Sequence, residues 1–178
     1  WEELAALGDA DIDLSDVGEA DDIAAGALLA GTDEAGLACE ENTLRYRVVP
    51  ELTIRLAQGG SRWDLLRVLN AASGTLGVEH LAVSVAQEDG MNADYLPWRV
   101  ESEDEFAARV ERGEVPGRVR WLGAWGDVAP SALWQAALKA SVTVIDSPVA
   151  SESATELRTM MREQSISRTR HRYGHVHA

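Results

Sequence analysis

The sequence has very little of two residue types that often carry chemistry. It contains one cysteine, Cys39, and one lysine, Lys139, in 178 residues. One cysteine excludes an internal disulfide and any metal site built from several cysteines. Cys39 is followed by Glu40 and Glu41, whose negative charges favour the thiol over the nucleophilic thiolate. We therefore expect a structural or incidental cysteine, and only one candidate for a Schiff-base or phosphate-binding lysine.

Long apolar runs are missing as well. No stretch approaches the ~20 apolar residues that span a bilayer, and no basic and apolar signal peptide is visible at the N-terminus. The first residue is Trp1 and not Met, so we expect a piece of a longer chain. A single cysteine fits a reducing compartment, and we expect a cytoplasmic protein. The length and the 46% hydrophobic content suffice for one packed core.

Basic residues are absent from the first part of the chain. Residues 1–42 hold 13 Asp and Glu and no Lys or Arg, whereas the other residues hold 17 acidic and 16 basic side chains. We interpret residues 1–42 as an acidic, irregular linker with one or two helical turns near Ile23 to Ala30. Such a block repels phosphate backbones, which disfavours nucleic-acid binding. An acidic docking surface is the alternative interpretation.

Beyond this segment, strand patterns alternate with helix patterns. Leu52, Ile54 and Leu56 alternate with more polar or smaller residues, which predicts a half-buried strand. Further strands are expected at 80–86, 98–100, 118–122, 142–145 and 166–170, and helices at 61–77, 102–112, from 130, and 152–164. This order predicts an α/β, Rossmann-like domain over residues 43–174, with a mostly parallel sheet of five or six strands and about four helices. The apolar run Val142 to Ile145 favours a central strand, and residues 175–178 form a tail.

Two short segments sit where a parallel sheet binds ligands. Gly59-Gly60-Ser61 follows a strand and opens a helix, which is where a nucleotide phosphate lies in dinucleotide-binding folds. The three-glycine fingerprint and the Gly-Lys-Ser/Thr motif are both missing, so a tight turn and a helix cap are favoured. Asp146-Ser147 follows another strand and is equally typical of a turn. The weak candidates for cofactor binding are Gly59, Gly60, Ser61, Asp146 and Ser147.

The end of the chain is rich in histidine and arginine. His171, His175 and His177 have a spacing that can chelate a metal, but no carboxylate or cysteine accompanies them, and a surface tail is favoured. Arginines at alternate positions of the last strand are either solvated or meet an acidic partner. The interface candidates are Arg168, Arg170, His171, Arg172 and Tyr173. No Gly-x-Ser-x-Gly elbow occurs, and no residue is assigned a catalytic role.

Two segments of the chain resemble the proline utilization A family. The run from Glu163 to Gly174 is similar to the C-terminal end of actinobacterial-type members, with Tyr173 where the family has Phe. The run from Cys39 to Arg47 resembles the family's Glu-x-Asn-x-x-Arg-Tyr-Arg-Pro segment, although Val48 replaces the proline. The resemblance covers roughly residues 39–174, and only its two ends are specific.

This resemblance implies a parent enzyme that oxidises proline with FAD and then oxidises the resulting pyrroline-5-carboxylate, or glutamate semialdehyde, to glutamate with NAD. Both catalytic modules would precede Trp1, and none of the family's catalytic residues maps onto this sequence. The domain would resemble a degenerate aldehyde dehydrogenase-type Rossmann domain without a cofactor of its own.

The resemblance also implies a place for the domain in that enzyme. It would pack on the aldehyde dehydrogenase module of its own chain, as the lid of a tunnel that channels the intermediate and as an assembly surface. The parent would lie in the cytoplasm or peripheral to the inner face of the membrane. A further hypothesis is a homo-oligomer in which the isolated domain dimerises through its last strand. The rival hypothesis is an independent Rossmann-like domain that binds a small molecule or nucleotide.

Overall fold

The centre of the molecule is a parallel sheet of five strands. The computed structural model describes residues 14–86, 97–115, 117–123 and 130–170. The sheet order is β4-β3-β2-β5-β6, with bounds of Leu52–Leu56 for β2, Leu81–Val85 for β3, Trp98–Val100 for β4, Arg118–Leu122 for β5 and Thr143–Ile145 for β6. This is the order of a doubly wound dinucleotide-binding sheet, whose switch point lies between β2 and β5. The predicted α/β class with a parallel sheet is confirmed.

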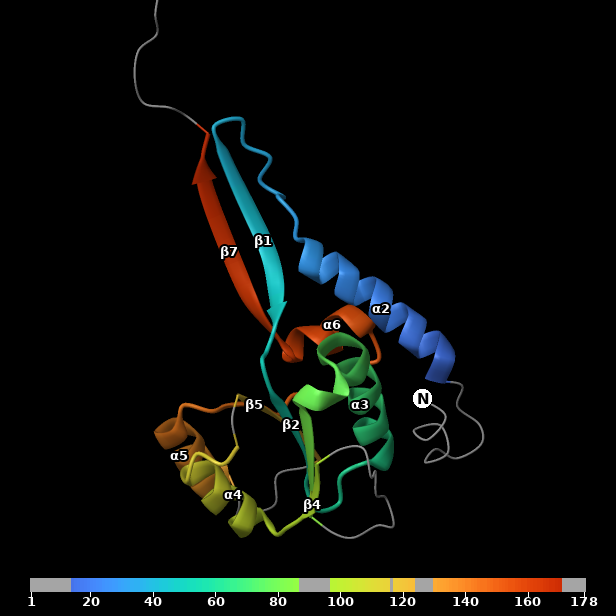
Figure 1. Cartoon of the computed structure of the whole chain (residues 1–178), viewed down its shortest axis with the longest axis vertical. Helices are drawn as coiled ribbons and strands as arrows, with labels where there is room; N and C mark the ends of the chain where they lie inside the picture. The colour runs from blue at the N-terminus through green and yellow to red at the C-terminus, as the bar shows by residue number, and fades with distance from the viewer. Residues whose placement is uncertain (1–13, 87–96, 116, 124–129, 171–178) are drawn as a thin grey trace, which may run out of the picture.

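Helices cover both faces of this sheet (Figure 1). Their bounds are Leu14–Ala30 for α2, Arg62–Leu76 for α3, Glu103–Glu111 for α4, Pro130–Ala140 for α5 and Ser153–Thr159 for α6, with a 3₁₀ turn, η1, at Val78–His80. One core cluster joins the sheet to α2, α3 and α6, and a second joins it to α4 and α5. Because both faces are covered, β2 is buried along its whole length, and the prediction of a half-buried strand is wrong.

The strand β6 lies at the edge of the sheet and not at its centre. It pairs with β5 alone, in parallel, over three residues from Thr143 to Ile145. Only Val144 is buried in this strand. The predicted central position is therefore wrong. An apolar run indicates that a strand is buried. Its place in the sheet depends instead on the connections between strands, which the run does not predict.

A two-stranded antiparallel ribbon projects from this body (Figure 1). It joins β1, Glu40–Val48, to β7, Met161–Thr169, with Glu40 opposite Thr169 and Val48 opposite Met161. The expected helix through residue 164 is wrong, because α6 ends at Thr159. The Thr159 hydroxyl donates to the Glu156 carbonyl (2.6 Å), and the chain then enters long-range pairing with β1, which overrides local helix propensity.

The segment before the ribbon is more regular than predicted. Helix α2 has 17 residues, where one or two turns were expected. Its Asp21 is buried and accepts hydrogen bonds from both terminal nitrogens of Arg67 (2.7 and 2.9 Å) and from Asn70 of α3 (3.1 Å). Ala25 and Leu28 add α2 to the core. The proposed boundary at residue 42 falls within β1 and stays a prediction. No helix in the described part of the chain is long and apolar enough to cross a membrane.

Candidate functional site

Gly59, Gly60 and Ser61 lie at the switch point of the sheet, between β2 and α3. The Gly60 amide donates to the Ala57 carbonyl (3.0 Å). A Cβ on Gly60 would lie 2.5 Å from Cδ1 of Leu56 and 3.1 Å from the Leu122 carbonyl oxygen. The close approach of this turn to the ends of β2 and β5 therefore favours glycine here. The Ser61 hydroxyl accepts from the Asp64 amide (3.4 Å) and caps α3.

The space beside these glycines is small and offers no positive charge. A cavity of about 170 Å³ is lined by Leu56, Ala57, Gln58, Gly59, Gly60, Val85 and Ala86. Asp64 sits in the first turn of α3, where its negative charge occupies the helix end that would otherwise attract a phosphate. Among the described residues, this site therefore has the position of a nucleotide site but lacks the positive charge that would bind a phosphate.

Asp146 and Ser147 are not brought to the same place. They follow β6, which is separated from β2 by β5, and both are exposed. The Ser147 carbonyl accepts a hydrogen bond from Nη1 of Arg120 (2.7 Å). Neither residue lines the cavity at Gly59 and Gly60. The two weak candidates for cofactor binding therefore do not form one site in the described part of the chain.

A buried ion pair lies beneath that loop. Arg120 of β5 and Glu156 of α6 are both completely buried, with Nε 2.8 Å from Oε1. Glu156 also accepts from the Ala150 amide (2.8 Å). The pair ties β5, the segment after β6 and α6 together, and α6 leads directly into β7. Its polar atoms are engaged in holding these elements, so we assign it a structural role.

A second buried network lies on the other face of the sheet. Nη1 of Arg55 donates to the Ser84 hydroxyl (2.7 Å), which donates to Glu101 (2.6 Å), and Glu101 pairs with Arg109 (2.7 Å). The Arg55 guanidinium lies 5.1 Å from the ring centroid of Phe106, a cation–π distance. Burial lowers the pKa of Arg55 to about 10, so the side chain stays charged at neutral pH. Its Nε and Nη2 have no partner within the described residues.

The histidine candidates cannot be placed. His171, His175 and His177 lie outside the described residues. Within the part of the chain that the structure describes, no group of three His, Cys, Asp or Glu side chains is arranged to hold a metal ion. Of the interface candidates, His171, Arg172 and Tyr173 also lie outside. Arg168 lies on β7 and Arg170 directly follows that strand.

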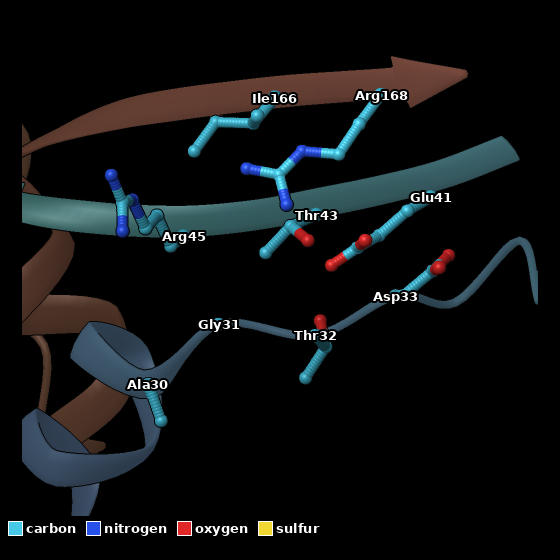
Figure 2. A pocket seen from close by; sticks show the side chains of 9 residues that line it. All are labelled: Ala30, Gly31, Thr32, Asp33, Glu41, Thr43, Arg45, Ile166 and Arg168. Atoms are coloured by element: carbon cyan, nitrogen blue, oxygen red, sulfur yellow. The ribbon is translucent and has the colours of Figure 1, made fainter. Parts of the chain in front are cut away.

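The two described interface candidates lie at the tip of the ribbon. Arg168 is opposite Glu41 in the β1–β7 pairing, and the Arg170 amide donates to the Cys39 carbonyl (2.8 Å). A pocket of about 400 Å³ opens between the ribbon and the segment after α2, and it is lined by Ala30, Gly31, Thr32, Asp33, Glu41, Thr43, Arg45, Ile166 and Arg168. Figure 2 shows the Arg168 side chain extending back along the ribbon, above Thr43.

The outer edge of the ribbon is open along β7. Thr32 exchanges two backbone hydrogen bonds with Leu44, each 2.8 Å long, so the Leu44 amide and carbonyl point away from β7. Leu44 and its partner Ser165 are therefore a non-hydrogen-bonded pair. The Ser165 backbone groups must then point outward, away from β1. The sheets of the described residues place β1 but no further strand beside β7.

The chain matches no known family model and no curated protein. Its fold is similar to a solved structure titled "Structure of Proline Utilization A (PutA) from Corynebacterium freiburgense". The TM-score is 0.55, the identity is 24%, and the match covers 99% of this chain and 15% of that one. The chain thus spans a small part of that protein. This likeness is one of fold.

Proposed function

We propose that this chain is a non-catalytic domain of a larger proline-catabolic enzyme, which packs against the aldehyde dehydrogenase module of its parent. It would close the tunnel that carries pyrroline-5-carboxylate, or glutamate semialdehyde, between two active sites. The parent would supply the FAD and NAD chemistry, and this chain would hold neither cofactor. The similarity in fold to a proline utilization A structure over 99% of the chain supports this proposal.

The observation that carries the proposal is the projecting ribbon with its open edge. A two-stranded ribbon is marginally stable by itself in water, and its outer strand is a template for pairing with another chain. Every residue of β7 from Arg162 to Thr169 is at least partly exposed. A ribbon of this kind is suited to docking, because a partner strand would add to β7 through main-chain hydrogen bonds.

A second observation is the kind of polar chemistry that the body contains. Five charged side chains of the described residues are buried, namely Asp21, Arg55, Glu101, Arg120 and Glu156, and each is bonded to a neighbouring element. The polar groups at the switch point are used in the turn at Gly60 and in the Ser61 cap of α3. This set suits a domain that contributes shape and interface area rather than acid–base or nucleophilic chemistry.

The rival is an independent small-molecule or nucleotide-binding domain. The strand order and the position of Gly59 and Gly60 favour it, since ligands of such sheets bind at the switch point. Against it stand the volume of about 170 Å³, the packing around Gly60 and the negative charge of Asp64. We therefore place it second.

The test is proline-dependent NADH production by the full-length parent and by a parent that lacks residues 43–178. Each component reaction, proline oxidation and direct semialdehyde oxidation, is measured beside it. We expect both component rates to survive the deletion, while the coupled reaction develops a lag and releases intermediate. Unchanged coupled turnover, together with tight nucleotide binding by the isolated chain, would replace this proposal with its rival.

A further inference from the structure

The charges of the ribbon are segregated between its two faces. Directly opposite residues of paired strands share a face, so the register of the ribbon places Arg45, Arg47, Arg162 and Arg168 on one face, together with Glu41. The same register places Glu40 and Glu163 on the other face. This segregation matters because the chain as a whole carries a net charge of −14. The positive charge of this acidic chain is thus concentrated locally on one face of the ribbon.

Two arginines of this face oppose each other at the base of the ribbon. Arg47 is directly opposite Arg162, and both side chains are exposed. Like charges in this position destabilise a pair of strands. Neither arginine makes a salt bridge or a side-chain hydrogen bond with any described residue. A repulsive pair without a compensating carboxylate is a cost that a negatively charged partner would remove.

The other half of the face forms the wall of the 400 Å³ pocket (Figure 2). Arg45 donates through Nε to Gln164 (2.8 Å), and no side-chain hydrogen bond or salt bridge joins Arg168 to another described residue. Figure 2 shows Thr43 beneath the Arg168 guanidinium, with the Arg45 side chain further along the ribbon and turned away from it. The carboxylate of Asp33 also lines the pocket, but it accepts from the amides of Gly36 and Asn42 (3.1 and 3.3 Å). The pocket thus presents one guanidinium group, that of Arg168, to an incoming anion, with the Glu41 carboxylate also in its lining.

We propose that the arginine face, defined as Arg45, Arg47, Arg162 and Arg168, docks on an acidic surface of a partner protein, one of whose carboxylates enters the pocket beside Arg168. This inference rests on the proposed function and specifies that the docking surface is basic and its partner surface acidic. It is carried by the segregated charge, the unrelieved Arg47–Arg162 pair and the pocket. Guanidinium groups match carboxylates because they offer paired donors in one plane.

A protein partner fits this face better than a nucleic acid does. Glu41 and Asp33 stand beside the arginines and would repel a continuous phosphate backbone, which needs many unopposed cations. Separate carboxylates on a folded surface can instead meet the arginines one by one. An oligonucleotide therefore serves as a test of this choice.

The test uses the full 178-residue chain and a fluorescein-labelled 15-residue Glu-rich peptide, followed by anisotropy at low and high salt. A Gln-rich peptide and a single-stranded oligonucleotide of equal length are the comparison probes. The variant is Arg47→Gln with Arg162→Gln. Its matched control is Arg99→Gln with Arg112→Gln, two exposed arginines of the α/β body. Circular dichroism checks that every variant is folded.

We expect the chain to bind the Glu-rich peptide in low salt despite its own negative charge, and to lose that binding as salt screens the contacts. The ribbon variant should bind about tenfold more weakly, a loss of about 1.4 kcal/mol, while retaining or gaining thermal stability. The control variant should bind as the unaltered chain does. Arg168→Gln should also weaken binding.

Absence of peptide binding, equal losses in the ribbon and control variants, or preference for the oligonucleotide would each overturn the arginine face. The proposed function has its own arm, association of the same chain with the parent enzyme that lacks residues 43–178. If that association is absent while the peptide binds through the arginines, the parent is wrong and the arginine face stands. If association persists in the ribbon variant, the parent stands and the arginine face is wrong.

Discussion

Arg120 and Glu156 form an ion pair in which neither side chain has any exposed surface, and Nε of Arg120 lies 2.8 Å from Oε1 of Glu156. The pair joins β5, an inner strand of the sheet, to α6, the helix that leads into β7. It therefore fixes the root of the ribbon on the body. Arg118, two residues earlier, donates from the same strand to the carbonyls of Thr159 and Met161 (2.7 and 2.6 Å), at the point where the helix becomes the ribbon.

Arg120→Met should destabilise the domain by about 3–5 kcal/mol, because it leaves the Glu156 carboxylate buried without its partner. Urea unfolding at pH 7 measures the change. Lys139→Met is the control, since it breaks an exposed pair with Glu111 and should leave the midpoint nearly unchanged. Replacing both members, Arg120→Met with Glu156→Leu, should cost less than the single change. A single variant as stable as the unaltered chain contradicts the structural role of this pair.

Asp21→Ala should release α2 from α3. The change removes the acceptor of two Arg67 bonds and one Asn70 bond, and charge-assisted bonds of this kind contribute about 1.5–3 kcal/mol each when lost. Hydrogen exchange should show faster exchange of the α2 amides than in the unaltered chain. Asp22→Ala, at the exposed neighbouring position, is the matched control. Equal exchange in the two variants would show that Asp21 does not hold the helix.

The capping box of α4 predicts a pH dependence. Glu105 accepts from the Ser102 amide and hydroxyl (both 2.8 Å), and these bonds, the backbone bond first, lower the pKa of Glu105 below its usual value of 4.5. The folded state therefore holds this proton less tightly than the unfolded state. Its contribution to stability is present above about pH 4.5 and is lost as the pH falls through the lower folded pKa.

Glu105→Gln tests this dependence. The difference in urea midpoint between this variant and the unaltered chain should be largest near pH 6 and should shrink below about pH 4.5. Glu103→Gln, in the same helical turn, serves as the control, because the two Ser102 bonds go to Glu105 and not to Glu103. A difference that stays constant from pH 6 to pH 3 would count against the capping box as its source.

Opposite charge changes on β7 should have opposite effects on stability. Arg162→Glu places a carboxylate opposite Arg47 and should stabilise the ribbon by about 0.2–1 kcal/mol, whereas Arg168→Glu places one opposite Glu41 and should destabilise it by a similar amount. Both variants carry the same net charge, so each is the other's control. Thermal unfolding at low salt measures both, and changes of equal sign would show that the register does not govern these charges.

The sequence predicted the elements whose signals are local. Ser61 and Ser102 cap helices as expected, and Ser102 forms the full capping box with Glu105. The alternation at Leu52–Leu56 correctly located a strand. It was misleading about Arg55 because alternation indicates one polar face, whereas a central parallel strand is covered on both faces. The alternation of strands with helices already implies a sheet that is covered on both faces. This signal could have shown that Arg55 and Arg120 are buried.

The ribbon was beyond the reach of local patterns. The run from Cys39 to Arg47 carries a family resemblance but predicts no strand, since the partner of β1 lies about 120 residues later in the chain. Likewise Glu163 and Gln164 are good helix formers, yet they lie in β7 opposite Tyr46 and Arg45. In both segments, pairing between distant parts of the chain determines the strand conformation. The docking surface that we propose therefore became visible only when the register was known.

The most direct test of the account is Ser165→Pro in the full-length parent enzyme. Proline has no amide hydrogen, and an outward-facing edge position tolerates it, so the ribbon should remain folded while strand addition to β7 is blocked. Ser165→Ala is the control. We measure proline-dependent NADH production together with the two component rates. We expect a lag in the coupled reaction for the proline variant alone, with both component rates unchanged. Coupled turnover without a lag in a folded Ser165→Pro enzyme would contradict docking through the edge of the ribbon.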